Sequence, residues 1–312
     1  MIVRPRPRPL QLLFVLRGTI LPRVLPQVLG ITALSCAVVW GMEHLGGYLP
    51  NASAAPMSLL GIALSIFLGF RNNACYDRWW EARKQWGALI IELRSLSREA
   101  IALLEDGGGG DGALTGRRDA RGIVHRNIAF AHALAAHLRG HDAVAELTRL
   151  LEEGERSRVL RSGHRPDAIL REQSLELAAL RRNGRLSDIA WSSLTERVHA
   201  LASVLAACER IRFTPLPFAY TVLLHRTAYL FCFLLPFGLA DALGWFTPVL
   251  SAAVAYTFFG LDLLGDELEE PFGKEPNDLP LLALARTAEI NLLEALGEPT
   301  PEPLEAVDFV LP

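Results

Sequence analysis

Charged residues are scarce in this 312-residue chain: only 21% are Asp, Glu, Lys or Arg, whereas 51% are hydrophobic. The mean hydropathy of +0.25 excludes the composition of an ordinary water-soluble globule and favours a membrane protein. Cysteine is rare as well. The four thiols lie far apart without any CxxC spacing, so neither a disulfide framework nor a cysteine zinc site is indicated. Their positions are Cys36, Cys75, Cys208 and Cys232.

Strand-like alternation of useful length, internal repeats and groupings of Ser, Cys, His and Asp at catalytic spacing are also lacking. We therefore predict an all-α protein that is not an enzyme and needs no cofactor. The glycine-rich stretch 106–116 precedes no Lys-Ser or Lys-Thr pair, which disfavours a phosphate-binding loop and favours a flexible linker.

Four apolar stretches approach the roughly 20 residues that a helix needs to cross a hydrocarbon core of about 30 Å. They are residues 24–45, 56–74, 216–240 and 245–264. We interpret them as four transmembrane helices per subunit. A buried helical core is the alternative, but runs of this length with so few charges disfavour it.

The distribution of basic residues predicts the orientation. The short loops 46–55 and 241–244 hold no Lys or Arg, whereas residues 1–23 and 75–215 hold nearly all of them. Because Lys and Arg are retained on the cytoplasmic side, both termini and the middle region should be cytoplasmic. The alternating Arg-Pro residues at 4–9 favour an extended tail near anionic lipid over a nucleic-acid contact. Residues 10–16 are too short to span a membrane, and no small-residue cleavage site follows them before Arg17 and Arg23, so we expect no cleaved signal peptide.

These patterns divide the chain into five regions. A cytoplasmic segment (1–23) precedes the first two membrane helices (24–74), a cytoplasmic helical region (75–215), two further membrane helices (216–264) and an acidic cytoplasmic region (265–312). The last region holds twelve acids against two basic residues, a net charge of −10. In region 75–215, apolar residues recur at steps of four and three, which predicts helices packed side by side in a bundle.

Histidines are frequent on one of these bundle helices. His137 and His141 have the spacing of two ligands on one helical face, but the sequence shows no third ligand. We therefore interpret them as solvent-facing or interfacial residues and predict no metal site.

The second membrane segment has two different faces. Ile62, Ile66 and Phe70 recur every four residues, and a stripe of small residues, Gly61, Ser65 and Gly69, lies beside them. Small residues at this spacing let helices approach closely in lipid. In a symmetric oligomer the bulky face could then line an axis and constrict a pore; a lipid-facing stripe is the alternative.

Three blocks of sequence resemble the bestrophin family, particularly its bacterial branch. The first is FLGFRNNACYDRWWEAR at 67–83, the second is CER at 208–210 with TPLPFAY at 214–220, and the third is EEPFG at 269–273 with NDLPL at 277–281. Their order and spacing cover residues 57–281, most of the chain.

The resemblance implies a homopentameric ion channel in the bacterial inner membrane, with the cytoplasmic bundles prolonging one axial pore. It implies a neck lined by Ile62, Ile66 and Phe70, the stripe already found from periodicity. It also implies a cytoplasmic restriction by one aliphatic residue, which counting back from the Arg181-Arg182 pair places at Ile169, with Leu170 and Leu177 as weaker candidates.

Polar residues follow the neck directly. Arg71, Asn72 and Asn73 should line the vestibule below it or anchor the helix at the membrane interface. Arg226, inside the third apolar stretch, needs a partner or water. Asp262 is the candidate partner, whereas a membrane boundary nearer Thr227 would place Arg226 at the interface instead. Lys274 stands where calcium-binding relatives carry acids, which disfavours calcium gating and leaves Asp278 to cap a helix or pair with the basic N-terminus.

We expect this channel to pass monovalent ions. An apolar neck selects weakly between signs of charge, and the flanking charges conflict: region 75–215 is basic and the tail is acidic. Resemblance to the bacterial branch favours cations, with a chloride channel or a non-conducting membrane scaffold as alternatives. The expected partners are membrane lipid, further copies of the chain and monovalent inorganic ions.

Overall fold

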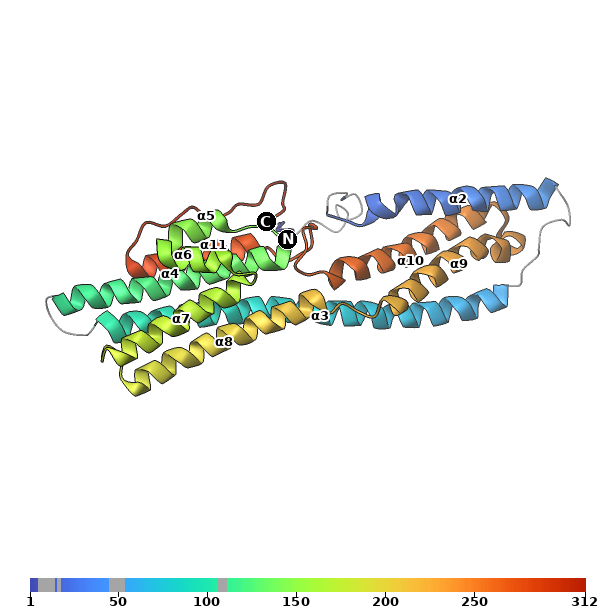
Figure 1. The fold of residues 1–312 in the computed structure, drawn as a ribbon. Coiled ribbons are helices and arrows are strands. Elements are labelled where there is room, and N and C mark those ends of the chain that lie inside the picture. The colour runs from blue at the N-terminus through green and yellow to red at the C-terminus, as the bar shows by residue number, and fades with distance from the viewer. Residues whose placement is uncertain (5–14, 16–17, 45–53, 106–110) are drawn as a thin grey trace. The chain divides into compact units, whose positions relative to one another are not determined.

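A computed structural model describes residues 1–4, 15, 18–44, 54–105 and 111–312 (Figure 1). Within these ranges the regular structure is helical apart from two isolated β-bridges, which pair Ile2 and Val307 with Val310. The described part of the chain therefore confirms the predicted all-α class. The Arg-Pro stretch 5–9, the loop 45–53 and the glycines at 107–110 lie outside the described residues.

The helices form two compact units. Residues 4–80 and 215–271 make the first, which we call the apolar unit; residues 1–3, 81–214 and 272–312 make the second, the bundle unit. One helix, α3 (Ala54–Glu105), contributes residues to both.

The apolar unit contains α2 (Leu21–His44), the first part of α3, α9 (Phe218–Leu243) and α10 (Thr247–Glu269). Among the residues that the structure describes, three helical stretches are long and apolar enough to cross a membrane, namely Leu21–His44, Pro56–Leu104 and Phe218–Glu269. The third stretch holds both α9 and α10, because the chain turns through the short 3-10 helix η1 (Gly244–Phe246). Gly244 has φ +48°, a left-handed conformation that glycine adopts without steric cost.

Large apolar side chains from all four helices fill the core of the apolar unit. Leu64 and Leu68 of α3 pack with Phe231 of α9 and Phe259 of α10, and each is at most 5% exposed. The helices are apolar on their outer faces as well, which is typical of segments surrounded by lipid.

Helix α3 is longer than the sequence patterns indicated. The predicted second membrane segment ends at residue 74 and the predicted first bundle helix follows it, yet both belong to one helix of 52 residues. No proline lies between Ala74 and Glu105, and the polar residues after Phe70 are compatible with helix, so nothing in the sequence ends it. The predicted stripe from Ala82 to Leu96 is buried in the bundle unit.

In addition to the part of α3 that follows residue 80, the bundle unit contains six described helices. They are α4 (Asp111–Arg139), α5 (Val144–Leu150), α6 (Glu153–Arg161), α7 (Arg165–Arg182), α8 (Asp188–Phe213) and α11 (Leu281–Leu296). Because α4 begins at Asp111, residues 111–116 of the predicted linker are helical instead. The apolar stripes predicted on α4 and α8 are buried, as Ile128 and Leu201 at 0% exposure illustrate.

Local capping fixes several helix ends. The Ser187 hydroxyl accepts a hydrogen bond from the Ala190 N–H at the start of α8, and Gly297 ends α11 with φ +68°. Asp278 closes the turn before α11 by accepting from the Glu275 N–H at 2.7 Å; it does not cap that helix, which begins at Leu281 without a side-chain cap.

Candidate functional site

The apolar stripe on α3 is uncovered in the protomer. Ile62, Ile66 and Phe70 are 60%, 51% and 61% exposed, whereas Leu64 and Leu68 on the opposite face are buried. Three large apolar side chains in one row, on a helix whose other face is in the core, leave a surface that needs lipid or another subunit against it.

The small residues beside this stripe behave differently from one another. A Cβ added at Gly61 would lie 3.0 Å from the Phe231 ring, so Gly61 is where α9 approaches α3 closely within the protomer. Around Gly69 nothing lies within 4 Å, and Ser65 is exposed with its hydroxyl bonded to the Gly61 carbonyl at 2.8 Å. Only Gly61 of this stripe therefore serves a contact inside one subunit.

Arg71 does not line a vestibule. Its side chain is 0% exposed and turns into the apolar unit, where it donates to Asp262 Oδ1 at 2.8 Å and forms an ion pair with Asp266. Glu269 lies 3.6 Å away. The prediction was wrong because a guanidinium in this apolar setting is stabilised by buried carboxylates, which α10 supplies. Asn73, in contrast, is exposed, and Asn72 is partly buried.

Asp262 likewise has partners other than the expected one. Its Oδ1 accepts from Arg71, and its Oδ2 lies 2.7 Å from His225 Nδ1. Arg226, the predicted partner, is exposed on α9. The adjacent His225 makes this contact instead, although its side chain is 52% exposed, since residues one step apart on a helix point about 100° apart.

Gly265 makes this charge cluster possible. A Cβ at this position would lie 2.7 Å from Asn72 Oδ1 and 3.2 Å from Arg71 Nη1. Because Gly265 has no side chain, Arg71 has the space to reach the carboxylates of α10.

The predicted cytoplasmic restriction is also misplaced. Ile169 is 1% exposed, and the weaker candidates Leu170 and Leu177 are 5% and 0% exposed. All three are core residues of the bundle unit, so they cannot face a pore. The aliphatic residue that α7 exposes is Leu175, at 56%. The helical period of α7 could have indicated Leu175, because it lies two residues from each of the buried positions 173 and 177 and so points to the opposite side of the helix.

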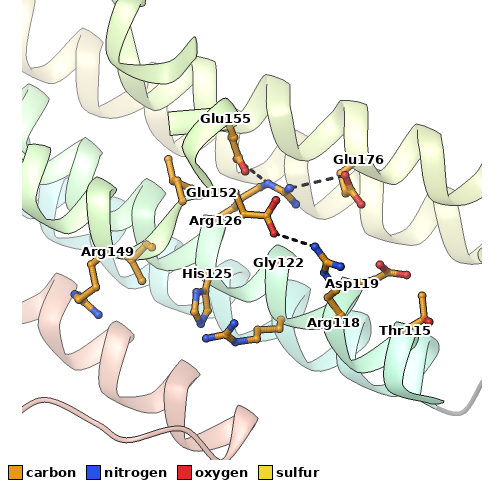
Figure 2. A pocket seen from close by; sticks show the side chains of 13 residues that line it. Thr115, Arg118, Asp119, Gly122, His125, Arg126, Arg149, Glu152, Glu155 and Glu176 are labelled. Atoms are coloured by element: carbon orange, nitrogen blue, oxygen red, sulfur yellow. Dashed lines mark hydrogen bonds and ion pairs between the residues drawn. The ribbon is translucent and has the colours of Figure 1, made fainter. Parts of the chain in front are cut away.

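A hollow of about 440 Å³ lies in the bundle unit between α4, α5, α6 and α7 (Figure 2). Its charges are largely paired. Arg126 donates to Glu155 at 2.7 Å and lies 3.8 Å from Glu176, while Arg118 lies 3.5 Å from Glu152. None of the predicted pore residues lines it, so we assign it no part in conduction.

One group of side chains in the described part of the chain has the composition of a metal site. It consists of His137, His164 and Glu209 and does not include His141, the residue that the spacing paired with His137. The sequence could not reveal this group, since its members lie 27 and 45 residues apart on different helices.

Together, the apolar helices, the uncovered apolar stripe and the buried charge cluster define an all-helical membrane protein. Residues 1–294 match the family described as bacterial and fungal bestrophin protein. The chain belongs to the bestrophin family, whose members are ion channels rather than enzymes.

Individual relatives agree with this assignment. A voltage-dependent anion channel-forming protein of Mesorhizobium japonicum is 44% identical over 99% of this chain and 96% of its own length. A protein of the same description from Escherichia coli (strain K12) is 44% identical over 96% and 95%. A crystal structure of a bacterial bestrophin homologue from Klebsiella pneumoniae, solved by Zn-SAD phasing, is 41% identical, with a TM-score of 0.81 over 88% of this chain and 99% of its own.

These relatives bear on the predicted ion preference. Both sequence relatives are described as forming anion channels. The predicted preference for cations therefore has no support among them, and the chloride alternative fits better.

Proposed function

We propose that the chain assembles as a homopentamer around one axial pore and conducts monovalent anions across the bacterial inner membrane. The observation that carries the proposal is the exposed row of Ile62, Ile66 and Phe70 on a helix whose other face is buried. Five such rows facing one axis would make three stacked apolar rings.

The rings would form a neck about 12 Å long, because eight residues of helix separate Ile62 from Phe70 at 1.5 Å each. An apolar constriction of this kind gates by excluding water, and small changes in its width switch conduction on or off. The side chains of the neck offer no ligand to an ion. Ions can therefore pass whenever water fills the neck.

Charge selection then falls to the groups flanking the neck. Arg71 is paired with Asp262 and Asp266 inside each subunit, so it presents no positive charge to the pore. Asn73 is exposed and remains our proposed polar lining of the vestibule, whereas the Asn72 amide oxygen is buried beside Gly265 of α10. The Asn73 amide group can donate hydrogen bonds to a passing anion.

A second restriction would lie in the bundle unit at Leu175, the exposed aliphatic residue of α7. Five copies would form another apolar ring on the same axis. Leu175 thus replaces Ile169 in this role.

The orientation that we propose has four membrane helices per subunit, corresponding to α2, the first part of α3, α9 and α10, with both termini in the cytoplasm. Its support is the absence of Lys and Arg from loops 46–55 and 241–244.

The reversal potential of purified protein in planar bilayers under an asymmetric NaCl gradient tests the function. A value near the chloride equilibrium potential is expected. A value near the sodium equilibrium potential would overturn anion selectivity while keeping the pore, and a repeated lack of current from well-folded oligomers would favour a scaffold.

Replacing Ile66 with Ala tests the neck itself. Smaller side chains at position 66 widen the neck, so single-channel conductance should rise while the oligomer stays intact. Phe67→Ala changes an equally exposed position on an adjacent face of α3 and should leave the conductance unchanged. Equal conductance in Ile66→Ala and Phe67→Ala would contradict the assignment of the neck.

A further inference from the structure

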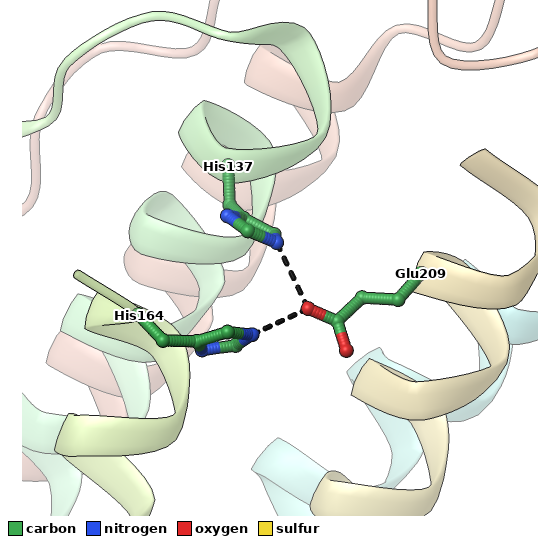
Figure 3. A group of neighbouring side chains, drawn as sticks. All are labelled: His137, His164 and Glu209. Carbon is green, nitrogen blue, oxygen red and sulfur yellow. Dashed lines mark hydrogen bonds and ion pairs between the residues drawn. The ribbon is translucent and has the colours of Figure 1, made fainter. Parts of the chain in front are cut away.

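Three helices of the bundle unit bring two imidazoles and one carboxylate together (Figure 3). His137 comes from the last turn of α4, His164 immediately precedes α7, and Glu209 comes from α8. The Nε2 atoms of His137 and His164 lie 2.9 and 2.5 Å from the same oxygen, Glu209 Oε1. All three ligand atoms lie within 4.8 Å of one another.

We propose that His137, His164 and Glu209 form a binding site for a divalent transition-metal ion of the zinc type. Two imidazoles and a carboxylate are a ligand set that zinc uses in proteins, with a water molecule in the fourth position of the tetrahedron. With neutral imidazoles the set carries one negative charge, which favours a cation. Alkaline-earth ions are disfavoured because they prefer oxygen ligands.

The geometry needs only a small change to accept the ion. Bonds of about 2.0–2.2 Å to nitrogen and oxygen place tetrahedral ligand atoms roughly 3.3 Å apart. The two separations from Glu209 Oε1 are shorter, 2.9 and 2.5 Å, so each Nε2 must move away from this oxygen by less than 1 Å. The two Nε2 atoms lie within 4.8 Å of each other and must also reach this spacing. Rotation about the bonds of these partly exposed side chains accommodates the adjustment.

The second nitrogen of His164 has a role that metal binding would alter. His164 Nδ1 accepts a hydrogen bond from the Asp167 N–H at 3.2 Å and so caps α7. The neutral ring therefore carries its proton on Nε2. Coordination through Nε2 shifts that proton to Nδ1, which can no longer accept, so the capping bond is released when the ion binds.

The site is open to ions from solvent. The side chains of His137, His164 and Glu209 are 23%, 39% and 27% exposed. A hollow of about 270 Å³, lined by His137 and Gly163 among others, adjoins it and provides a path of entry. The aromatic ring of Phe213 packs edge-on against the imidazole of His137, with 5.9 Å between the ring centroids, and restricts the movement of that imidazole.

Binding of the ion would connect α4, α7 and α8 through one centre. Apolar packing and ion pairs such as Arg126–Glu176 already join some of these helices, but His137 and Glu209 are 72 residues apart in the chain and an ion would hold both directly. The ion would thus stabilise the bundle unit by binding the folded state alone.

Isothermal titration calorimetry with zinc chloride on the full-length, detergent-purified protein, stripped beforehand with a chelator, tests the proposal. We expect one zinc ion per subunit. Glu209→Gln keeps an oxygen acceptor for both imidazoles and so preserves the fold, yet it should weaken zinc binding by at least about tenfold, as His137→Ala should. The matched control is His199→Ala, which removes an exposed histidine from the same helix as Glu209 and should bind like the wild type.

Cobalt(II) in place of zinc gives a second readout that does not depend on affinity. Wild-type protein and His199→Ala should show the intense visible absorption of four-coordinate cobalt, and Glu209→Gln should lose it. Absence of zinc binding to the wild type, or equal binding and equal spectra in all variants with intact oligomers, would overturn the site. None of these measurements requires conduction, so they are independent of the proposed function.

Discussion

Replacing Glu289 with Gln measures how far a buried carboxylate stabilises the bundle unit. Glu289 lies on α11 with its side chain 0% exposed, 2.8 Å from His132 Nε2 and 3.2 Å from Arg286 Nε, and it also pairs with Arg149. Glutamine keeps the volume and one oxygen acceptor but removes the charge. His132, 6% exposed, and the two guanidinium groups then lose their counter-charge.

The size of the effect follows from the burial of each partner. Removing one member of a buried ion pair costs about 3–5 kcal/mol. Arg149 and Arg286 are 48% and 26% exposed and so remain partly hydrated. We therefore expect the lower end of that range for Glu289→Gln, about 3 kcal/mol.

Thermal unfolding of the detergent-solubilised protein, followed by circular dichroism, measures this loss. For a unit of this size, about 3 kcal/mol corresponds to a decrease in Tm of roughly 6–12 °C. Glu294→Gln, at an exposed position of the same helix, is the matched control and should change stability by no more than about 0.5 kcal/mol. Equal Tm values for Glu289→Gln and Glu294→Gln would refute the reasoning.

The same carboxylate makes stability depend on pH, with a definite sign. Burial by itself raises the pKa of Glu289, but the hydrogen bond from His132 and the charges of His132 and Arg149 outweigh it and hold the pKa below its ordinary 4.5. A lowered folded-state pKa adds stability above the unfolded pKa, and that stability is lost as pH falls through the folded value. The Tm difference between wild type and Glu289→Gln should therefore persist at neutral pH and shrink below pH 4.5.

Three other substitutions or treatments test separate features. Arg71→Met leaves Asp262 without its buried counter-charge and should destabilise the protein by about 3–5 kcal/mol, seen as a lower Tm; an unchanged Tm would contradict the buried pairing. Gly265→Ala forces a Cβ within 2.7 Å of Asn72 Oδ1 and should cost about 1–3 kcal/mol by thermal unfolding, whereas Gly30→Ala, with nothing within 4 Å, should cost nothing. Burial raises the pKa of the Cys208 thiol to about 12, so iodoacetamide at pH 8 should label it only after unfolding; rapid labelling of the native protein would show that the core is open there.

Patterns carried by single helices could be predicted from the sequence. The spacing of Ile62, Ile66 and Phe70 depends only on the 3.6-residue period of α3, and the structure leaves all three exposed as one row. The apolar stripes of the bundle followed from the same period. The continuity of α3 through residue 74 was missed because a change from apolar to polar composition marks a change of surroundings and does not end a helix.

Contacts between distant segments could not be predicted in the same way. Arg71 and Asp262 are 191 residues apart, and nothing in either segment identifies the other. Ile169 was chosen by counting positions from a resemblance, whereas the choice between Ile169 and Leu175 depends on which side of α7 packs into the bundle. The His137, His164 and Glu209 group required three helices to be in place.

The separation of Arg71 from its carboxylates also has a consequence for biosynthesis. Arg71 leaves the ribosome 191 residues before Asp262, an interval of roughly 10–40 s at about 5–20 residues per second. During that interval the guanidinium has no buried counter-charge and must stay hydrated; in the orientation that we propose, this holds it at the cytoplasmic surface and would help to retain that end of the nascent helix there. In this orientation, insertion of α10 would then supply the acids, and a residue that first directs the topology of the chain would become part of its interior.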